Sequence, residues 1–278
     1  RHGALYAGRL PRPLALKSVC DKDTVTRRDA PWDPGNILAD AEAVLGDPEI
    51  DVVVELVGGL EPARTFIQTA LSRGKHVVTA NKHLLAHHGA ELMALAEQNG
   101  VGLLFEAAVA GGIPIIRALQ QGLAANEITS VEGILNGTCN YILTRMSEAE
   151  GTPFEQVLAE AQAKGYAEPD PTYDVEGYDT AHKTAILASL AFGMDIRFQD
   201  VYVEGIGAIQ PVDFQYAARL GFAIKLLGIA RKDPRNGSVE ARVHPTLVPS
   251  SSPLGQVRGV FNSVQVEGDP VGTTVYYG

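Results

Sequence analysis

The sequence predicts an α/β protein, in which a doubly wound, Rossmann-like parallel sheet is followed by a second α+β unit. Residues 51–57 are rich in β-branched side chains, as in a parallel strand that is covered on both faces. Strand-like and helix-like segments then alternate as far as residue 105, which is typical of a parallel sheet with crossover helices. After about Gly112 this alternation ends, and the pattern indicates a second unit.

The helix after the first strand is marked at both ends. Pro62 suits a first helical turn, and apolar residues at helical spacing predict a helix over 63–72 that Gly74 ends. The pattern then predicts a strand, a helix and a strand at 76–79, 84–98 and 101–105.

Upstream of these segments, residues 14–20 form a strand candidate that ends at Asp21. In a dinucleotide-binding sheet, the first strand and its Gly-rich turn lie about 20 residues before such an acidic residue. Gly3 and Gly8 do not have the spacing of that turn. We therefore expect the chain to begin in mid-fold, with the fingerprint glycines upstream of Arg1.

The second unit mixes strands and helices. A turn-rich stretch at 233–237 separates two apolar strands and suggests an antiparallel hairpin. The remaining pattern predicts strands at 130–135, 260–266 and 273–277, and helices at 140–148, 154–164 and 180–192.

Composition narrows the class of ligand. Hydrophobic residues make up 45% of the chain and charged residues 20%, which excludes a disordered protein. The net charge is −10 and no Lys/Arg run occurs, so neither nucleic acid nor an anionic membrane is the expected partner. With only Cys20 and Cys139, no membrane-length apolar stretch and no secretory signal, we expect a cytoplasmic protein that binds small molecules.

The segment 165–183 gathers several carboxylates around one lysine. Two prolines stiffen the loop that carries Glu168, and Asp179 is placed as a helix N-cap. Lys183 follows four residues later, on the apolar face of that helix. A solvated acidic loop with an i,i+4 ion pair is one interpretation. A site for a substrate with an ammonium group and a reacting hydroxyl is the other.

This segment resembles the signature of homoserine dehydrogenases at Ala161, Gly165, Tyr166, Ala167, Glu168, Asp170, Pro171, Asp174, Val175, Gly177, Asp179 and Lys183. The resemblance covers essentially the whole chain and includes residues 79–82, 106–114, 136–141, 259–262 and 267–268. It implies an NAD(P)-dependent oxidoreductase that interconverts L-homoserine and L-aspartate 4-semialdehyde, in the biosynthesis of threonine, methionine and isoleucine. It also implies a homodimer.

The resemblance assigns roles to single residues. Glu168 and Asp179 would hold the amino group of homoserine, with support from the charge of Asp174. Lys183 would exchange the hydroxyl proton, and Lys82, expected at the end of a strand, would be a second essential lysine. Gly137 and Thr138 would offer a backbone amide and a hydroxyl to the substrate.

The resemblance and the expected sheet together divide the chain into two domains. Residues 1–112 would form an incomplete nucleotide-binding domain to which 255–278 return, and 113–254 a substrate-binding and dimerisation domain. Asp21 suits the ribose of NAD, whereas Lys22, Arg27 and Arg28 suit the 2′-phosphate of NADP, so both coenzymes stay open. The other expected coenzyme contacts, at or near the ends of strands, are Gly58, Thr79 and Lys82.

Two further clusters have a structural and a functional interpretation. The Gly-rich stretch 106–113 suits a tight crossover, whereas the resemblance implies a monovalent cation site, for example for sodium, at Glu106, Val109, Gly111 and Ile113. His83, His87 and Glu91 follow each other on one helix, and the first two could share a zinc ion. The row spans about 12 Å, so all three cannot converge on one ion. A solvated helix face is the favoured interpretation there, and a core thiol is favoured for Cys139.

Two rival functions remain at this point. Another two-domain semialdehyde or amino-acid dehydrogenase would share the sheet but not the segment 168–183. A catalytically silent Rossmann-like binding module would fit a chain that truly begins at Arg1, without phosphate-binding glycines.

Overall fold

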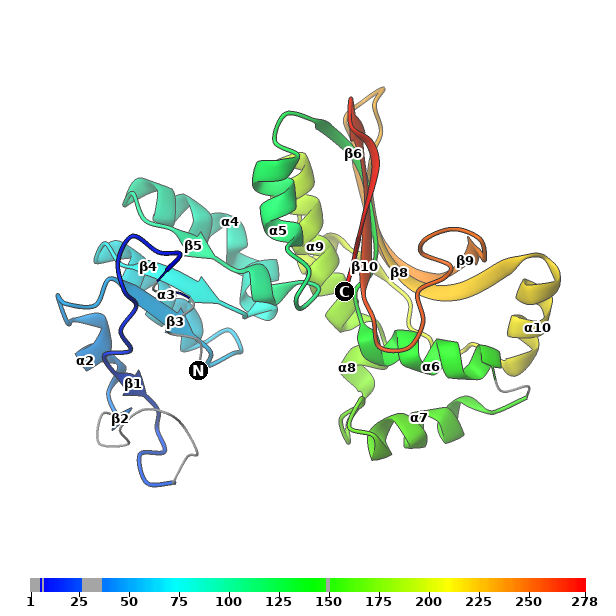
Figure 1. Ribbon diagram of the computed structural model, residues 1–278, viewed down its shortest axis with the longest axis horizontal. Helices are drawn as coiled ribbons and strands as arrows, with labels where there is room; N and C mark the ends of the chain where they lie inside the picture. The colour runs from blue at the N-terminus through cyan, green and yellow to red at the C-terminus, as the bar shows by residue number, and fades with distance from the viewer. Residues whose placement is uncertain (1–5, 7, 27–36, 149–150) are drawn as a thin grey trace.

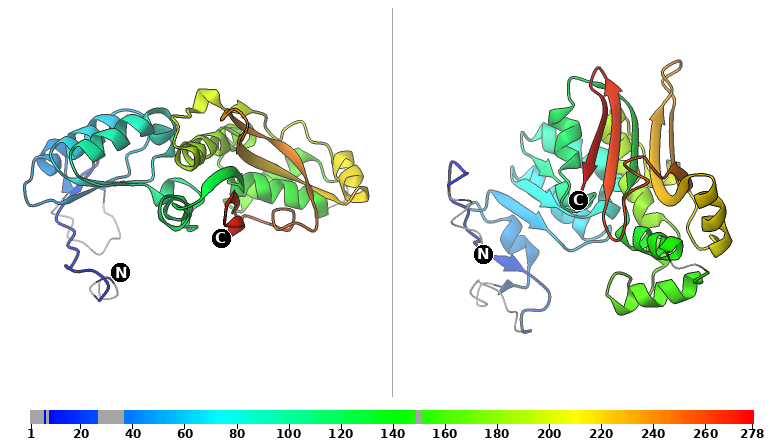
Figure 2. Two further views of the ribbon diagram at one scale, coloured as in Figure 1. Left: turned by 90° about the horizontal axis from the view of Figure 1, so that it is seen from above. Right: turned by 45° about the vertical axis from the view of Figure 1, so that its right-hand side comes forward.

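The computed structural model describes residues 6, 8–26, 37–148 and 151–278. It has two lobes, which meet along helix α4 (Lys82–Gln98) and helix α9 (Tyr178–Phe192) (Figure 1). Figure 2 shows the same division from above and from the side. The first lobe contains the residues up to about 105, and the second contains the remainder.

A three-stranded parallel sheet forms the centre of the first lobe. Its strands are β3 (Val52–Glu55), β4 (His76–Thr79) and β5 (Leu103–Leu104), in that spatial order. Helix α3 (Ala63–Ser72) links β3 to β4, and α4 links β4 to β5, as the alternation predicted. Preceding them are a small parallel pair and a short helix, β1 (Val19–Cys20), β2 (Ile37–Leu38) and α2 (Ala41–Leu45).

Only one face of this sheet is covered by the described residues. Helices α3 and α4 bury Ile67, Leu71 and Leu92 against Val77. On the opposite face Val54 is 59% exposed, although its strand was expected to be covered on both sides. Successive side chains of a strand point to opposite faces, so helices packed on one face leave alternate valines exposed.

The second lobe is built on a six-stranded mixed sheet. Its spatial order is β11-β10-β6-β8-β9-β7, and the only parallel pair among these described strands is β7 with β9. The strands are β6 (Glu127–Ile134), β7 (Tyr202–Val203), β8 (Phe222–Lys232), β9 (Val239–Pro249), β10 (Ser263–Asp269) and β11 (Gly272–Tyr277). The predicted hairpin is confirmed, because β8 pairs antiparallel with β9.

Helices surround this sheet and connect its strands. They are α5 (Ile115–Arg117), α6 (Gly137–Glu148), α7 (Phe154–Ala163), α8 (Thr172–Val175), α9 and α10 (Pro211–Arg219). Helix α9 packs on β8, β9 and β6, and it also contacts α4 of the first lobe. It is therefore the element through which the second sheet reaches the first lobe (Figure 1).

The expected return of residues 255–278 to the first lobe is wrong. Strand β10 pairs with β6, and β11 pairs with β10, so both strands belong to the six-stranded sheet. Val264 and Val266 are fully buried, which fits the core face of that sheet. The end of the chain nevertheless lies near the junction of the lobes, where Gly278 approaches Ile113 (Figure 1).

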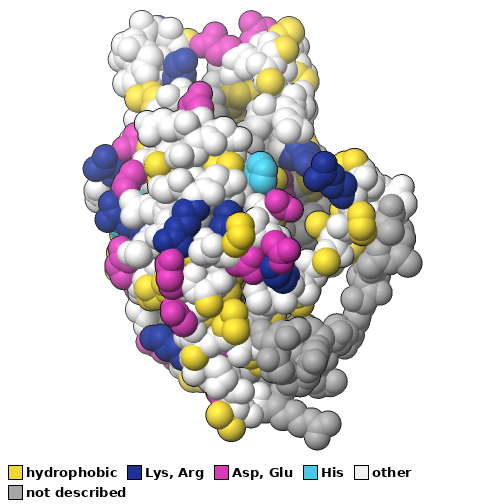
Figure 3. All heavy atoms as spheres, turned by 90° about the vertical axis from the view of Figure 1, so that its left-hand side faces the viewer, with side chains coloured by type: hydrophobic (Ala, Val, Ile, Leu, Met, Phe, Trp, Pro, Cys, Tyr) yellow, Lys and Arg dark blue, Asp and Glu magenta, His cyan; other side chains and the backbone are white. Residues whose placement is uncertain are grey.

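Among the described residues, no helix combines the length and the apolar character that crossing a bilayer requires. On the face of the molecule in Figure 3, basic and acidic side chains are interspersed.

One glycine makes a close approach that a side chain would disrupt. A Cβ atom at Gly205 would lie 2.4 Å from the carbonyl oxygen of Val175, whereas at Gly207 no atom is nearer than 4.0 Å. We expect Gly205→Ala to lower the free energy of unfolding by about 1–3 kcal/mol, because backbone must move. The matched Gly207→Ala should change it by less than about 0.5 kcal/mol. Urea unfolding measures both, and equal effects would contradict the packing described here.

Candidate active site

The first lobe presents Lys82 at the start of a helix. The side chain of Asn81 accepts a hydrogen bond of 3.1 Å from the backbone N–H of Leu84, so Asn81 caps α4 and Lys82 is its first residue. The sequence had placed Lys82 at the end of a strand and begun the helix at residue 84. That prediction was wrong because β4 ends at Thr79 and the asparagine cap starts the helix earlier.

The second lobe presents Lys183 from α9. This helix begins at Tyr178, and the residue before it, Gly177, has a left-handed φ of 84°. Asp179 therefore lies in the first turn and is not the N-cap that the sequence predicted. The expected spacing of four residues to Lys183 is present, and it places both side chains on one face of α9.

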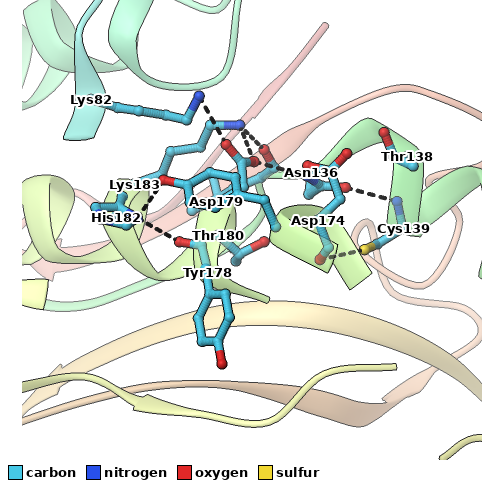
Figure 4. Close-up of polar contacts among 12 residues, drawn as sticks. Lys82, Asn136, Thr138, Cys139, Asp174, Tyr178, Asp179, Thr180, His182 and Lys183 are labelled. Carbon is cyan, nitrogen blue, oxygen red and sulfur yellow. Dashed lines mark hydrogen bonds and ion pairs between the residues drawn. The ribbon is translucent and has the colours of Figure 1, made fainter. Parts of the chain in front are cut away.

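Asp179 joins the two lysines. Its Oδ2 atom lies 2.6 Å from Nζ of Lys183, and its Oδ1 atom lies 3.1 Å from Nζ of Lys82 (Figure 4). The side chain of Asp179 is only 5% exposed. One buried carboxylate thus holds an amine from each lobe.

The electrostatics of Asp179 follow from these contacts. Burial alone would raise the pKa of its carboxyl, but the charges of Lys183 and Lys82 and its hydrogen bonds lower the pKa below the ordinary value. Asp179 is therefore ionised at neutral pH. Nζ of Lys183 also donates to the carbonyl oxygen of Leu135 at 2.7 Å, which fixes its position.

Asn136 connects a second carboxylate to this centre. Its Nδ2 atom donates to Oδ1 of Asp174 at 2.7 Å and to Oδ2 of Asp179 at 2.8 Å (Figure 4). Its Oδ1 atom accepts from the backbone N–H of Cys139 at 2.8 Å. Sequence reasoning assigned Asn136 no role, although it begins the segment 136–141. Cys139 itself is buried, and burial raises the pKa of its thiol, as expected of a core thiol.

The first turn of α6 lies beside these carboxylates. A Cβ atom at Gly137 would stand 2.6 Å from the carbonyl oxygen of Val260, so only glycine fits there. The hydroxyl of Thr138 donates to the carbonyl oxygen of Tyr166 at 2.6 Å. The backbone N–H groups of Gly137 and Thr138 have no acceptor among the described residues, as is usual in a first helical turn, and such groups bind anions.

Glu168 makes no hydrogen bond or ion pair with this cluster among the described residues. It is exposed, and its backbone carbonyl accepts a hydrogen bond from Gln162. The sequence analysis did not select Tyr173, whose ring centroid is 5.9 Å from Nζ of Lys82.

The carboxyl edge of the first sheet is organised by Glu55. This buried carboxylate accepts from the backbone N–H of Gly58 at 2.9 Å and from the hydroxyl of Thr79 at 2.6 Å. The expected coenzyme contact Thr79 is itself 1% exposed, so its hydroxyl supports the edge from within. Sequence reasoning missed Glu55, and the available signal was a charged residue inside an apolar β-branched run.

The expected cation ligands lie in a turn that has its own structural role. The carboxylate of Glu106 accepts the backbone N–H groups of Ile116 at 2.8 Å and Arg117 at 3.1 Å, at the start of α5. Ala110 and Gly111 have positive φ values of 58° and 56°, which turn the chain sharply. The tight crossover is thus present, and Val109 and Ile113 are buried within it.

Asp21 lies exposed directly after β1. Its backbone N–H donates to the carbonyl oxygen of Leu38, and its carboxylate accepts from the backbone N–H of Asp23. Arg27 and Arg28, the expected partners of a 2′-phosphate, lie outside the described residues.

Comparison with known proteins identifies the family. The family model described as "Homoserine dehydrogenase" matches residues 114–278, and the model "Homoserine dehydrogenase, NAD binding domain" matches residues 3–106. The chain belongs to the homoserine dehydrogenase family. The family predicted from the segment 161–183 is therefore confirmed. The predicted fold, a Rossmann-like parallel sheet followed by a second α+β unit, is confirmed as well.

Individual homoserine dehydrogenases are similar over most of this chain. The Pseudomonas aeruginosa enzyme is 54% identical over 242 residues, which are 87% of this chain and 55% of that protein. The Synechocystis enzyme is 50% identical over 275 residues, which are 98% of this chain and 63% of that protein. The chain thus spans about 55–63% of the length of these two relatives.

Solved structures of homoserine dehydrogenases have the same fold. A Staphylococcus aureus enzyme is similar with a TM-score of 0.86 and 39% identity, over 100% of this chain and 67% of that chain. A hyperthermophilic archaeal enzyme in complex with NADPH is similar with a TM-score of 0.73 and 28% identity, over 86% of this chain and 68% of that chain.

The bridge formed by Asn136 leads to a prediction on stability. Asn136→Ala removes one hydrogen bond from each of two buried or half-buried carboxylates and one from the backbone N–H of Cys139, so we expect the free energy of unfolding to fall by about 1–3 kcal/mol. Asn99→Ala, at an exposed position after α4, is the matched control and should change it by less than about 0.5 kcal/mol. Chemical denaturation measures both, and an unchanged midpoint for Asn136→Ala would refute the bridge.

Proposed function

We propose that this protein is an active homoserine dehydrogenase, which interconverts L-homoserine and L-aspartate 4-semialdehyde with NAD or NADP. It would act in the biosynthesis of threonine, methionine and isoleucine. The observation that carries the proposal is the contact of Lys82 and Lys183, from different lobes, with the single carboxylate of Asp179.

The substrate amino group would bind at the carboxylates. Asp174 and Asp179 lie on either side of the amide of Asn136, and an ammonium ion is the natural partner of such a pair. The α-carboxylate of homoserine would bind the free backbone N–H groups at Gly137 and Thr138. Glu168 stays in the proposal, because its loop lies beside this helix start through the contact of Tyr166 with Thr138.

Lys183 would exchange the proton at the reacting oxygen. Its amine is held by Asp179 and by the carbonyl of Leu135, and its side chain remains 16% exposed. In the reducing direction the Lys183 ammonium gives a proton to the aldehyde oxygen, and in the oxidising direction the amine takes the hydroxyl proton back. The bound coenzyme supplies or accepts the hydride. Lys82, which is 33% exposed, would steady the charge at the same oxygen.

The coenzyme would lie along the carboxyl edge of the first sheet. Gly58 and Gly59 have positive φ values, and a Cβ atom on either would meet no atom within 4 Å, so open space borders the edge. Asp21 would accept a hydrogen bond from the adenosine ribose, and Thr79 would stabilise the edge through its hydrogen bond to Glu55. The likeness to an archaeal relative in complex with NADPH supports a nicotinamide coenzyme without deciding between NAD and NADP.

Three further parts of the proposal concern a cation, the assembly and the location. Glu106 would bind a sodium ion with carbonyl oxygens of Val109, Gly111 and Ile113, since oxygen-only donors suit a hard cation and each carboxylate oxygen keeps a second lone pair.

A homodimer would form through the six-stranded sheet, whose strand β11 exposes Val275 and Tyr277. We infer a cytoplasmic location from the composition.

A silent binding module is the second candidate. It explains the sheet, but it gives no reason for two amines from different lobes to meet at a buried carboxylate. Assay of NADPH and NADH formation with L-homoserine separates the two functions.

We expect Lys183→Ala to lower the turnover number by about 10²–10⁴-fold, because the variant lacks the group that exchanges the proton. The matched control is Lys232→Ala, which removes a lysine on β8 that pairs with Glu127 outside the site and should leave turnover unchanged. Initial rates of NADPH formation at saturating homoserine measure both. Turnover of Lys183→Ala close to that of the unaltered protein would refute the proposed role.

We expect Lys82→Ala to lower turnover by about 10-fold or more while coenzyme binding changes little, because its amine faces Asp179 and the substrate side. Coenzyme dissociation constants from fluorescence titration, measured beside the turnover number, test this. Weak coenzyme binding together with normal turnover at saturating coenzyme would make Lys82 a coenzyme anchor.

A further inference from the structure

Three histidines from the two lobes meet at the junction. His83 and His87 lie one turn apart on α4, and His182 lies on α9. One ring nitrogen of each can be chosen so that all three lie within 4.8 Å of one another. The sequence favoured a solvated helix face for His83 and His87. The structure instead packs both against His182, with ring centroids 5.0 Å and 5.4 Å from it.

Backbone carbonyls fix the protonation of two of these rings. Nδ1 of His87 lies 2.9 Å from the carbonyl oxygen of His83. Nδ1 of His182 lies 2.8 Å from the carbonyl oxygen of Tyr178 and 2.7 Å from the hydroxyl of Tyr173. A carbonyl oxygen only accepts and a hydroxyl oxygen can accept as well, so a proton on each Nδ1 satisfies these contacts and leaves a lone pair on each Nε2. Metal-binding histidines are oriented by this kind of second contact.

The Nε2 atom of His182 lacks a partner. His182 is 2% exposed, and within the described part of the chain nothing hydrogen-bonds to its Nε2. A buried acceptor without a donor is uncommon, and a bound ion would satisfy it.

We propose that His83, His87 and His182 bind one divalent transition-metal ion of the zinc class, which joins α4 to α9. Imidazole nitrogens suit zinc, cobalt, nickel and copper, and three histidines leave one position of a tetrahedron for water. Ligand nitrogens of such an ion lie about 3.4 Å apart, given Zn–N bonds of about 2.0–2.1 Å, so the three rings would move closer together when the ion binds.

The ion is structural in this proposal. His83 directly follows Lys82 in the sequence, and His182 directly precedes Lys183. The ring of His182 nevertheless points away from both lysine amines (Figure 4). An ion there ties the two lobes together behind the lysines and takes no part in hydride or proton transfer. The site therefore stands or falls independently of the proposed dehydrogenase activity.

Aromatic packing alone does not account for the cluster. Phe198 stacks on His182 at 4.2 Å between centroids, and the Tyr173 ring lies 5.5 Å from it between centroids. These contacts explain why the ring is buried. They offer no hydrogen-bond donor to its Nε2 atom, which is the feature that an ion explains.

Cobalt(II) titration of the metal-free full chain tests the site without substrate or coenzyme. We expect one ion per chain, the intense visible absorption of four-coordinate cobalt, and loss of the colour when zinc displaces it. His87→Ala and His83→Ala should each weaken binding by at least about 10-fold, as expected from losing one of three protein ligands. His88→Ala is the matched control on the same helix and should bind as the unaltered chain does.

Thermal unfolding gives the second measurement. Zinc should raise the midpoint temperature of the unaltered chain and of His88→Ala, increasingly with zinc concentration, but not that of His87→Ala. Circular dichroism checks that each variant is folded. Cobalt binding that survives both His83→Ala and His87→Ala, absorption of the weak six-coordinate type, or no thermal shift with zinc would each overturn the proposal and leave an imidazole–aromatic cluster only.

Discussion

The position of both lysines depends on one buried negative charge. A carboxylate that is almost fully removed from water is unfavourable unless it is paired and hydrogen-bonded. Asp179 meets this requirement with Lys183 from its own helix, Lys82 from the other lobe and the amide of Asn136. Because the partners come from three segments, the folding of each lobe and their contact are all needed before the charge is stabilised.

The same dependence explains why the site lies at a junction. Helix α4 starts where β4 ends, so Lys82 is delivered at the carboxyl edge of the parallel sheet. Helix α9 packs on the mixed sheet and contacts α4 along one side. The two helices are thus the rigid supports of the lysines, while Asp174 comes from α8 and the free amides from the first turn of α6.

Local sequence patterns predicted the elements well and their ends less well. The β-branched runs gave β3 and β4, and the turn at 233–237 gave the hairpin, because period and turn chemistry are local properties. The return of 255–278 was predicted wrongly, since the pairing of β10 with β6 joins strands more than 120 residues apart and no local pattern encodes it. The starts of α4 and α9 were missed because capping depends on backbone geometry at Asn81 and Gly177.

For the candidate site, the sequence predicted what spacing can show. The separation of Asp179 and Lys183 is a helical repeat, and it was found. Asn136 and Glu55 act through contacts over 24 to 43 residues, so neither has a signal at fixed spacing. Glu168 was selected from resemblance, and in the structure it is exposed and shares no hydrogen bond with Asp174 or Asp179.

The close approach of Gly137 to Val260 has a consequence for redesign of substrate selectivity. Since no side chain fits at the first position of α6, the amides there cannot be covered or extended by mutating that position. The stretch before β10 is held to α6 by Asn140, whose side-chain amide donates to the carbonyls of Gly259 and Phe261. If the substrate carboxylate binds these amides as proposed, admitting a bulkier acid would require changes at residues 259–261, more than 120 positions downstream of Gly137.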